Sequence, residues 1–450
     1  MPTQMFSIPG LNPWNILFLV VLIAWSISRK KEGLKWDMPA KINILLVLYL
    51  VVISVSVIRG VSDIKVLHAY FELIGARSPQ AFDIIMDQFV NSIKWVVPGL
   101  LVYDGCRNQD RIKITLIVGG AVYFFIALQI ISRMGFASIL DAGALQKKAV
   151  RVLAKTIGYH RVDLATMMSG AAWVFFSWRF LFNRKSMKMV SLVCFGVATL
   201  ALLLTAGRAG YGAWVIIAVF LGFIRWRKLL LILPIFVMLG ILVVPAARDR
   251  IFEGFTDESH EKSAETLGLE TVDDSGRDLY AITSGRVIIW PYVFEQIGEH
   301  LFFGVGEFGM IRSGASEQVF LLLGAPWNHP HNAYLRLLLD SGLFGTIPIL
   351  GFFTIVVMLS FRLFTNKDPF LSVIGASCLA AVLAQLIGSI GAQSFNPRPG
   401  VLVMWVFIGL AFRVGYRPFD SKEVAEKPVS SNTHWKDQFD SKLALSFRDK

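Results

Sequence analysis

The chain has 450 residues, of which 55% are hydrophobic and only 17% are charged, and its formal net charge is +12 at pH 7. A soluble domain cannot bury so much apolar surface, so the composition excludes an ordinary soluble enzyme and indicates a polytopic membrane protein. Much of the positive charge lies in short Lys/Arg clusters between apolar runs, as the positive-inside rule requires, so we expect no nucleic-acid partner. The three cysteines, Cys106, Cys194 and Cys378, lie far apart and predict neither a disulfide framework nor a cysteine metal site.

Apolar runs of spanning length, about 17–25 residues each, dominate the sequence. We count eleven, and one more or one fewer is the alternative because some runs are short. The prediction is an all-α polytopic membrane protein with about 11–12 transmembrane helices and one long outer (periplasmic) loop that contains short helices. The eleven runs are 13–28, 42–58, 84–103, 114–131, 163–182, 188–206, 209–224, 229–245, 343–363, 370–392 and 400–415.

The loops between these runs predict the orientation. Every second loop carries a basic cluster, beginning with SRKKEGLK after the first run, so these loops are expected in the cytoplasm. The N-terminus then lies outside and the C-terminus inside. One outer loop, 132–161, is also basic. It is either an amphipathic helix on the membrane surface or a sign that the count of spans is wrong.

Loop lengths divide the chain into four parts. Residues 1–245 are predicted to form an N-terminal transmembrane bundle, 246–342 a periplasmic catalytic loop, 343–416 the C-terminal transmembrane helices, and 417–450 a disordered cytoplasmic tail. Within the long loop, the acidic segment 253–278 is expected to be mobile, and an apolar, glycine-rich part follows it.

The stretch PWNHPHNAYLRLLLDSGLFG closes the long loop. Pro330 restricts His329 to extended geometry, and Asn332 is suited to cap a helix that stops at Gly342. His331 is therefore predicted at the outer membrane surface, where a neutral imidazole can act as a general base. The alternatives are an interfacial histidine that only packs and a metal site from His-x-His. No third ligand is evident, so we predict no metal.

Three arginines are candidates for phosphate binding. Arg208, in TAGRAGYGAW, and Arg286, in TSGRVIIW, lie near the outer surface, where a charge is costly and usually functional. Arginine stays protonated and binds phosphate in a bidentate way, so these two are predicted to hold a diphosphate. Arg336, one turn beyond His331, is a supporting candidate. For each of the three, a structural or snorkelling arginine is the alternative.

The segment GVGEFG, at 304–309, resembles a phosphate loop only weakly, because no βαβ unit surrounds it. Its glycines more simply permit a tight turn under the site. Glu307 is either an acid–base partner or a solvated carboxylate, and the second is the simpler interpretation. No Walker A sequence and no Asp-x-Asp sequence occurs, which disfavours an ATP-driven pump and a metal–nucleotide-sugar transferase.

Together these elements resemble the O-antigen ligase/O-antigen polymerase family of bacterial membrane glycosyltransferases. The ligases carry a His followed by Asn or Ser, nine residues, and then Gly-x-x-Gly at the end of the long outer loop. Here the corresponding residues are His331, Asn332, the nine residues AYLRLLLDS, Gly342 and Gly345. The family also shows a Gly-rich turn, an SGR…W element and an Arg beside a small-residue turn. In this sequence GVGEFG resembles the Gly-rich turn, Ser284–Trp290 resembles the SGR…W element, and Arg208 resembles the Arg beside the small-residue turn. The resemblance covers roughly residues 200–413.

The resemblance implies transfer of a glycan from undecaprenyl diphosphate to an acceptor hydroxyl at the periplasmic face of the inner membrane, as in lipopolysaccharide biosynthesis. His331 is then the general base, and Arg208 and Arg286 hold the departing diphosphate. The supporting candidates are Asn332, Arg336, Glu307 and His329. The resemblance implies an inverting reaction with no metal and no cofactor. The acceptor is lipid A core in a ligase and a lipid-linked repeat unit in an O-antigen or exopolysaccharide polymerase, and the motif leans slightly to ligase.

The alternative outside this class is a transporter for a polar solute. Charged residues within the apolar runs, such as Lys94 and Arg179, would then line its path. Many transporters show internal repeats of spans, and no convincing repeat is evident here, so transport is disfavoured.

Overall fold

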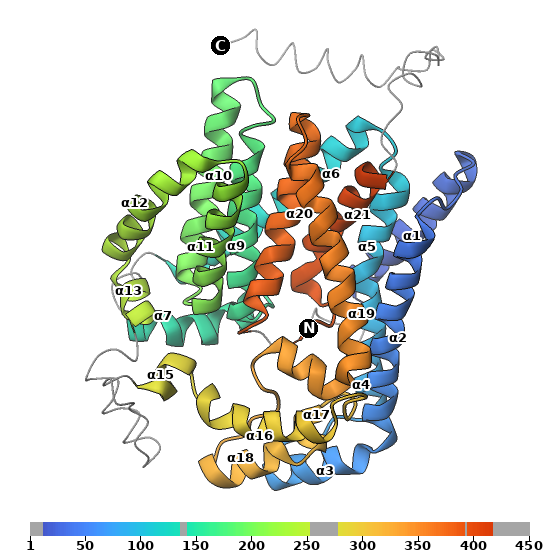
Figure 1. The fold of residues 1–450 in the computed structure, drawn as a ribbon, viewed down its shortest axis with the longest axis vertical. Coiled ribbons are helices and arrows are strands. Elements are labelled where there is room, and N and C mark those ends of the chain that lie inside the picture. Colours follow the sequence, from blue (N-terminus) through green and yellow to red (C-terminus); the bar gives the residue numbers. More distant parts are fainter. Residues whose placement is uncertain (1–11, 136–141, 253–277, 392–393, 417–450) are drawn as a thin grey trace. The chain divides into compact units, whose positions relative to one another are not determined.

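The computed structural model describes residues 12–135, 142–252, 278–391 and 394–416, and this part of the chain consists of helices joined by loops (Figure 1). The predicted class, an all-α polytopic membrane protein, is confirmed.

By their contacts, the described residues lie within one unit, Met1–Arg417. The acidic segment up to residue 277 and the tail at 417–450, for which mobility and disorder are predicted, lie outside the described residues. The proposed division of the chain at 245 and 342 stays a prediction.

Long apolar helices alternate with short ones along the chain. Residues 12–252 contain α1 (Pro13–Lys31), α2 (Ala40–Ser62), α3 (Ile64–Leu73), α4 (Ala81–Ile84) with the π-helix η2 (Ile85–Val90), α5 (Asn91–Gly105), α6 (Gln109–Met134), α7 (Ala142–Lys148) with the π-helix η4 (Ala149–Leu153), α8 (Ala154–Thr156), α9 (Arg161–Trp178), α10 (Lys185–Leu204), α11 (Arg208–Ile224), α12 (Arg227–Val243) and α13 (Pro245–Phe252). Residues 278–416 contain α15 (Leu279–Thr283), α16 (Arg286–Glu299), α17 (Gly309–Arg312), α18 (Ala315–Leu323), α19 (Ala333–Phe364), α20 (Pro369–Gly388), the 3-10 helix η5 (Pro399–Val401) and α21 (Leu402–Tyr416).

Each of the eleven predicted spans falls on a helix, and six helices of the described chain are long and apolar enough to cross a membrane. These are α2, α6, α10, α19, α20 and the segment Pro399–Tyr416. The helix α11 is apolar but has only 17 residues. Because α1, α5, α9 and α12 do not meet both criteria, the count of eleven to twelve spans stays a prediction.

The core of the bundle lies around α9 and α20. Every residue of α9 from Leu164 to Ser177 is buried against α10, α11 and α20, so this helix uses small and polar residues that a lipid-facing helix would not need. Trp173 is fully buried, and its indole Nε1 donates to the carbonyl oxygen of Trp214 at 2.9 Å. This packing fixes where α9 and α11 begin, which positions the site described below.

Four short helices, α15 to α18, cover the end of the bundle at which α9 and α11 begin, and we call them the cap (Figure 1). The cap has an apolar core of its own, to which α19 also contributes. Its buried residues are Ile289, Val293, Ile297, Met310, Ala315, Val319 and Leu339. The predicted long loop is therefore an ordered helical layer over its described part.

The helix α19 is broken at Gly342, as the sequence predicts. Gly342 has φ 61° and ψ −168°, a conformation essentially restricted to glycine, and a Cβ there would lie 2.3 Å from the carbonyl oxygen of Phe302. The break frees the N–H groups of Leu343 and Phe344, which donate to the carbonyl oxygens of Leu301 and Phe302 at 2.8 and 3.1 Å.

On the other side of the break, the N–H of Val305 donates to the carbonyl oxygen of Leu339 at 2.8 Å. These three backbone hydrogen bonds, which we call the clamp, join the segment after α16 to α19 on both sides of Gly342.

The basic segment 132–161 forms, within its described part, a short helical stretch through α7, η4 and α8 that lies across the cap end of the bundle (Figure 1). Leu145, Ala149 and Leu153, spaced four residues apart, are all fully buried. The stretch is therefore amphipathic, as one of the two sequence interpretations expects.

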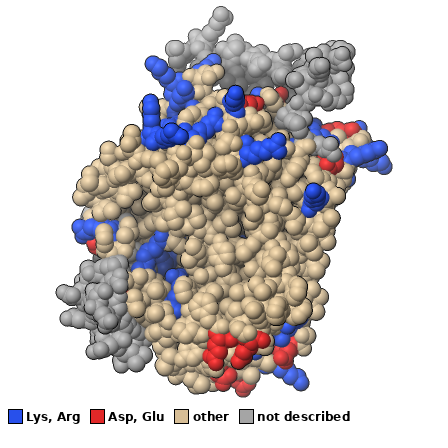
Figure 2. All heavy atoms as spheres, in the orientation of Figure 1, with Lys and Arg blue, Asp and Glu red and all other residues tan. Residues whose placement is uncertain are grey.

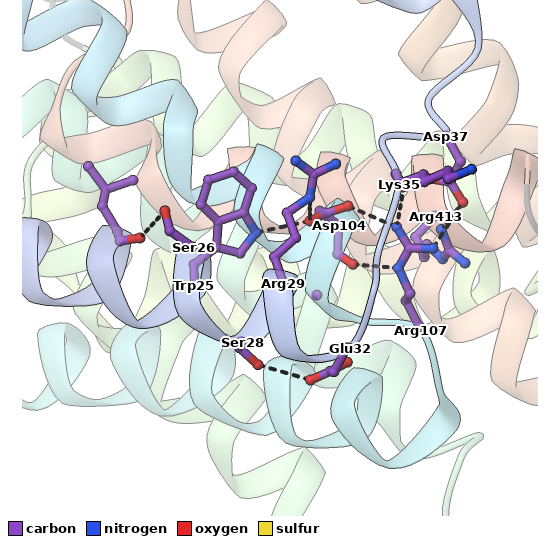
Figure 3. Close-up of polar contacts among 12 residues, drawn as sticks. Trp25, Ser26, Ser28, Arg29, Glu32, Lys35, Asp37, Asp104, Arg107 and Arg413 are labelled. Carbon is purple, nitrogen blue, oxygen red and sulfur yellow. Dashed lines mark hydrogen bonds and ion pairs between the residues drawn. The ribbon is translucent and has the colours of Figure 1, made fainter.

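A polar network holds the opposite end of the bundle together (Figure 3). Asp104 is fully buried and pairs with Arg29 at 3.1 Å and with Arg107 at 2.8 Å, and it also accepts from Nε1 of Trp25. Asp37 joins Arg107 to Arg413 of α21. Because α1 has no buried residue of its own, these bonds, together with the hydrogen bond from Lys94 of α5 to Asn15 of α1, connect it to the rest of the bundle.

Charged side chains gather at the two ends of the bundle (Figure 2). On the face shown, Lys and Arg lie mainly at the end opposite the cap, Asp and Glu lie at both ends, and a broad region between the ends carries few charges. This pattern is typical of a protein whose middle lies in a bilayer.

Candidate active site

The loop before α19 holds His331 in a defined position. His331 has φ 50°, a left-handed conformation that only a few per cent of non-glycine residues adopt. The carbonyl oxygen of Pro330 accepts from Nε1 of Trp290 at 3.0 Å. On the other side, Asn332 caps α19 as predicted, because its Oδ1 accepts from the N–H groups of Tyr334 and Leu335 at 2.9 and 3.3 Å.

The start of α19 is also fixed to the end of α20. The N–H of Ala333 donates to the carbonyl oxygen of Ser389 at 2.8 Å, and the hydroxyl of Tyr334 donates to that of Leu386 at 2.8 Å. His331 is therefore held between the cap and the bundle, and backbone strain at such a position is typical of functional sites.

The imidazole of His331 lies between two other rings. The ring of Trp327 is 5.0 Å away and that of His329 is 4.2 Å away, and both are close to perpendicular to it. Burial lowers the pKa of His331 to about 3, and so does the proximity of His329, Arg286 and His160, because a protonated His331 would be repelled by the charged form of each. The imidazole is therefore neutral near pH 7 and has a nitrogen free of a proton, as a general base requires.

The second histidine of the motif is also neutral. Burial, together with the charge of Arg336, lowers the pKa of His329 to about 4, and its buried Nδ1 has no hydrogen-bond partner among the described residues. His329 is thus a neighbour of His331, as predicted, but no role for it follows from these contacts.

The structure brings Arg208 and Arg286 to the same place. Arg208 is the first residue of α11, and its Nη2 donates to the carbonyl oxygen of Ala281 at 3.0 Å and to the hydroxyl of Ser284. Arg286 is the first residue of α16, and its Nη1 donates to the carbonyl oxygen of Thr283 at 3.2 Å. Burial and the charge of Arg208 lower the pKa of Arg286.

Sequence reasoning missed two residues at this site, His160 and Arg161, at the start of α9. Arg161 donates to the carbonyl oxygen of Ala206 at 2.8 Å, just before Arg208, and the proximity of His160 contributes to the low pKa of His331. The available signal was the pair His-Arg directly before an apolar run, on the same side of the membrane as Arg208. Basic side chains do line a hollow between the ends of α9 and α11 and the cap (Figure 2).

Two supporting candidates have a different environment from the one predicted. Glu307 is buried rather than solvated, and its carboxylate pairs with Arg336. Arg336 also pairs with buried Asp340 at 3.1 Å, one helical turn away. The expectation of a solvated Glu307 is therefore wrong. The guanidinium of Arg336 forms ion pairs with the carboxylates of Glu307 and Asp340, whereas Arg208 and Arg286 lie together elsewhere.

The segment GVGEFG forms the tight turn that its glycines predict. Gly304, Gly306 and Phe308 all have positive φ. The N–H of Glu307 donates to the carbonyl oxygen of Ser56 at 2.8 Å, which joins the turn to α2. Together with the buried ion pairs, this turn supports the start of α19 and hence the position of His331.

Among the described residues, no group of three or more His, Cys, Asp and Glu side chains is arranged to hold a metal ion. Lys94 and Arg179, the charged residues that would line the path of a transporter, each contact neighbouring side chains of the protein. Lys94 donates to Asn15 and Asn91 at 3.1 and 2.7 Å, and the guanidinium of Arg179 lies 3.8 Å from the ring centre of Phe176. These contacts favour the structural interpretation of both residues.

Residues 190–350 match the protein-family model described as O-antigen ligase. This part of the chain is therefore similar to the O-antigen ligase family. The O-antigen ligase domain includes Arg208, Arg286 and His331, so the two predicted arginines and the histidine lie inside the matched range. The match supports the assignment of the protein as a membrane glycosyltransferase of the O-antigen ligase or polymerase type. No curated protein matches the chain.

Proposed function

We propose that the protein transfers a glycan from undecaprenyl diphosphate to an acceptor hydroxyl at the periplasmic face of the bacterial inner membrane. The observation that carries this proposal is a neutral imidazole, His331, within electrostatic reach of Arg286, which itself adjoins Arg208. A base beside two phosphate-binding cations is what displacement of a diphosphate by a hydroxyl requires.

The reaction begins with proton transfer from the acceptor hydroxyl to His331. The hydroxyl oxygen bonds to the anomeric carbon as the bond from that carbon to the diphosphate oxygen breaks, which inverts the configuration. The electron pair of the broken bond stays on the diphosphate, where Arg208 and Arg286 stabilise the charge. His331 then releases its proton to solvent.

The position of the site suits a donor with a lipid tail. His331 lies where α19 and α20 meet the cap, so a headgroup at the site can keep its tail in the bilayer beside the apolar helices. The donor is already activated, which agrees with a site built from arginines and a histidine rather than a nucleotide loop. We therefore propose a reaction that needs neither metal nor cofactor.

The acceptor is the point on which a ligase and a polymerase differ. In a ligase the hydroxyl belongs to lipid A core, and in a polymerase it belongs to another lipid-linked repeat unit. Arg208 and Arg286 act on the donor and His331 needs only a hydroxyl, so the site is compatible with both acceptors, and the experiment below includes both.

The decisive test is a transfer assay with purified protein in nanodiscs, in the presence of a chelator. Undecaprenyl-diphosphate-linked glycan is supplied with lipid A core in one arm and with a second lipid-linked unit in the other. Transfer to lipid A core identifies a ligase, and ladders of longer lipid-linked chains identify a polymerase. Transfer to neither acceptor contradicts the proposal and leaves transport as the function to pursue.

Substitution of His331 tests its role as the base. His331→Ala removes the imidazole, and His331→Asn does so while keeping a residue type that tolerates left-handed φ. We expect both variants to lose at least about 100-fold in kcat, because general-base catalysis contributes roughly 100- to 10,000-fold. The matched control is His300→Asn at the exposed end of α16, which should transfer normally. Normal turnover in the His331→Asn variant would exclude His331 as the base.

A further inference from the structure

A third arginine lies beside Arg208 at the start of α9. Nη1 of Arg161 donates to the carbonyl oxygen of Ala206 at 2.8 Å, two residues before Arg208. The two helices touch closely here, since a Cβ on Gly207 would lie only 2.5 Å from Cβ of Ala165. Arg161 is therefore fixed against the turn from which Arg208 emerges.

Arg286 reaches the same place from the cap. A Cβ on Gly391 would lie 3.7 Å from Nη2 of Arg286 and 2.9 Å from Cβ of Ala209, the residue after Arg208. Arg208 in turn donates to Ser284, two residues before Arg286. Contacts from three separate parts of the chain thus bring Arg161, Arg208 and Arg286 together, which we call the arginine cluster.

Two of the three arginines in the cluster, Arg161 and Arg286, have no carboxylate partner among the described residues. Asp163, the nearest acidic residue in sequence to Arg161, pairs with Arg398 at 2.8 Å. Half-buried cations that repel one another are costly, so their arrangement indicates an anion that binds among them.

The place of each arginine in its helix supports the same conclusion. Arg161, Arg208 and Arg286 are the first residues of α9, α11 and α16. A cation is unfavourable at the positive end of the helix dipole, so helix stability does not explain these three residues. An anion at this point receives hydrogen bonds from guanidinium groups and is favoured by the helix ends.

We propose that Arg161 is a third phosphate-binding residue of this site and that the cluster binds two linked phosphates rather than one. Three guanidiniums exceed what one phosphate group needs, whereas a diphosphate can share them. This inference rests on the proposed function, because it names the diphosphate as the group that leaves. Single phosphate groups on an acceptor share part of this chemistry, but two phosphates joined directly are the mark of a diphosphate-linked lipid, which is the form of the proposed donor.

The test measures binding of inorganic pyrophosphate to the purified full-length protein by isothermal titration calorimetry, with inorganic phosphate in a parallel arm. In the wild-type protein we expect pyrophosphate to bind at least tenfold more tightly than phosphate. Arg161→Gln should weaken pyrophosphate binding roughly tenfold or more, which corresponds to about 1.4 kcal/mol, the scale of one lost hydrogen bond to a charged group. Arg161→Lys keeps the charge and should recover part of the affinity.

The matched control is Arg227→Gln. Arg227 is also the first residue of a helix, α12, but it is exposed and lies at the other end of the bundle, so pyrophosphate binding should not change. Thermal unfolding of each variant shows whether it is folded.

The outcomes separate this inference from the proposed function. Wild-type affinity in a folded Arg161→Gln variant overturns the role of Arg161, and equal affinity for phosphate and pyrophosphate overturns the choice of a diphosphate. Pyrophosphate binding that depends on Arg161, with no glycan transfer to either acceptor, supports the anion site and contradicts the transferase. Glycan transfer without any pyrophosphate binding contradicts the arginine cluster and leaves the transferase standing.

Discussion

At the scale of single residues, the low pKa of His331 has two opposite effects on its action as a base. An imidazole with a pKa of about 3 is neutral, but it is also a weak base, because efficient bases have a pKa near the working pH. Burial is the largest cause of the low value, and the charge of Arg286 contributes to it. A bound diphosphate offsets that charge, so donor binding should raise the pKa of His331 and strengthen the base.

This coupling predicts different pH profiles for kcat/KM and for kcat. The kcat/KM profile reports the free enzyme, in which His331 loses activity only as pH falls toward about 3, so it should stay level from pH 7 to about 4.5. The kcat profile reports the substrate complex and should fall at a higher pH, since the pKa is raised there. Steady-state rates over this range give both profiles. A kcat/KM that falls near pH 6.5 would indicate an ordinary solvated histidine instead.

At the scale of elements, the break in α19 separates two functions of one helix. The segment before Gly342 begins at the N-capping residue Asn332 and carries Arg336 with its two ion pairs. The segment after Gly342 crosses the apolar part of the bundle. Only glycine fits the break, because of its dihedral angles and because the backbone of Phe302 lies where a Cβ would be.

Replacing this glycine should therefore destabilise the protein. Gly342→Ala places a Cβ within 2.3 Å of the Phe302 backbone and should lower the free energy of unfolding by roughly 3 kcal/mol. The control is Gly351→Ala in the same helix, where no atom lies within 4 Å of the added Cβ. Alanine there should be neutral or stabilising by up to about 1 kcal/mol. Thermal unfolding in detergent compares the two, and equal stability of both variants would refute the role of the break.

Helix positions and helix ends were the part of the fold that the sequence could predict. The Asn332 cap and the stop at Gly342 follow from local chemistry, since each depends on bonds within a few residues. The burial of Glu307 does not, because its partner Arg336 is 29 residues away in sequence. Arg161 was missed for the same reason, since its place beside Arg208 depends on the packing of α9 against α11.

At the scale of the whole molecule, the two ends of the bundle are held together in different ways. The cap covers one end, and a network of ion pairs connects the helices at the other end. Asp104 joins α1, which has no buried residue, to α5, and Asp37 extends the connection to α21 (Figure 3). The first and last helices of the described chain are thereby linked through charged side chains that are fully or partly buried.

Loss of the Asp104 charge should destabilise the protein at the end of the bundle opposite the cap. Asp104→Asn leaves Arg29 and Arg107 without their buried partner, and breaking a buried pair costs roughly 3 kcal/mol. Asp110→Asn is the control, because Asp110 is 88% exposed and pairs only loosely with Lys113 at 3.7 Å. We expect a clear fall in Tm for the first variant and almost none for the second. Equal Tm values for the two would show that the network contributes little.

The clamp also determines which sequence changes this fold tolerates. Its three bonds run between main-chain atoms, with the N–H groups of Val305, Leu343 and Phe344 as donors. Any amino acid except proline supplies such a donor, so the side chains at these positions can vary without loss of the clamp. Phe302, Phe303 and Phe344 are all largely exposed around it, which leaves those positions free to adapt to the surrounding lipid while the frame behind His331 stays the same.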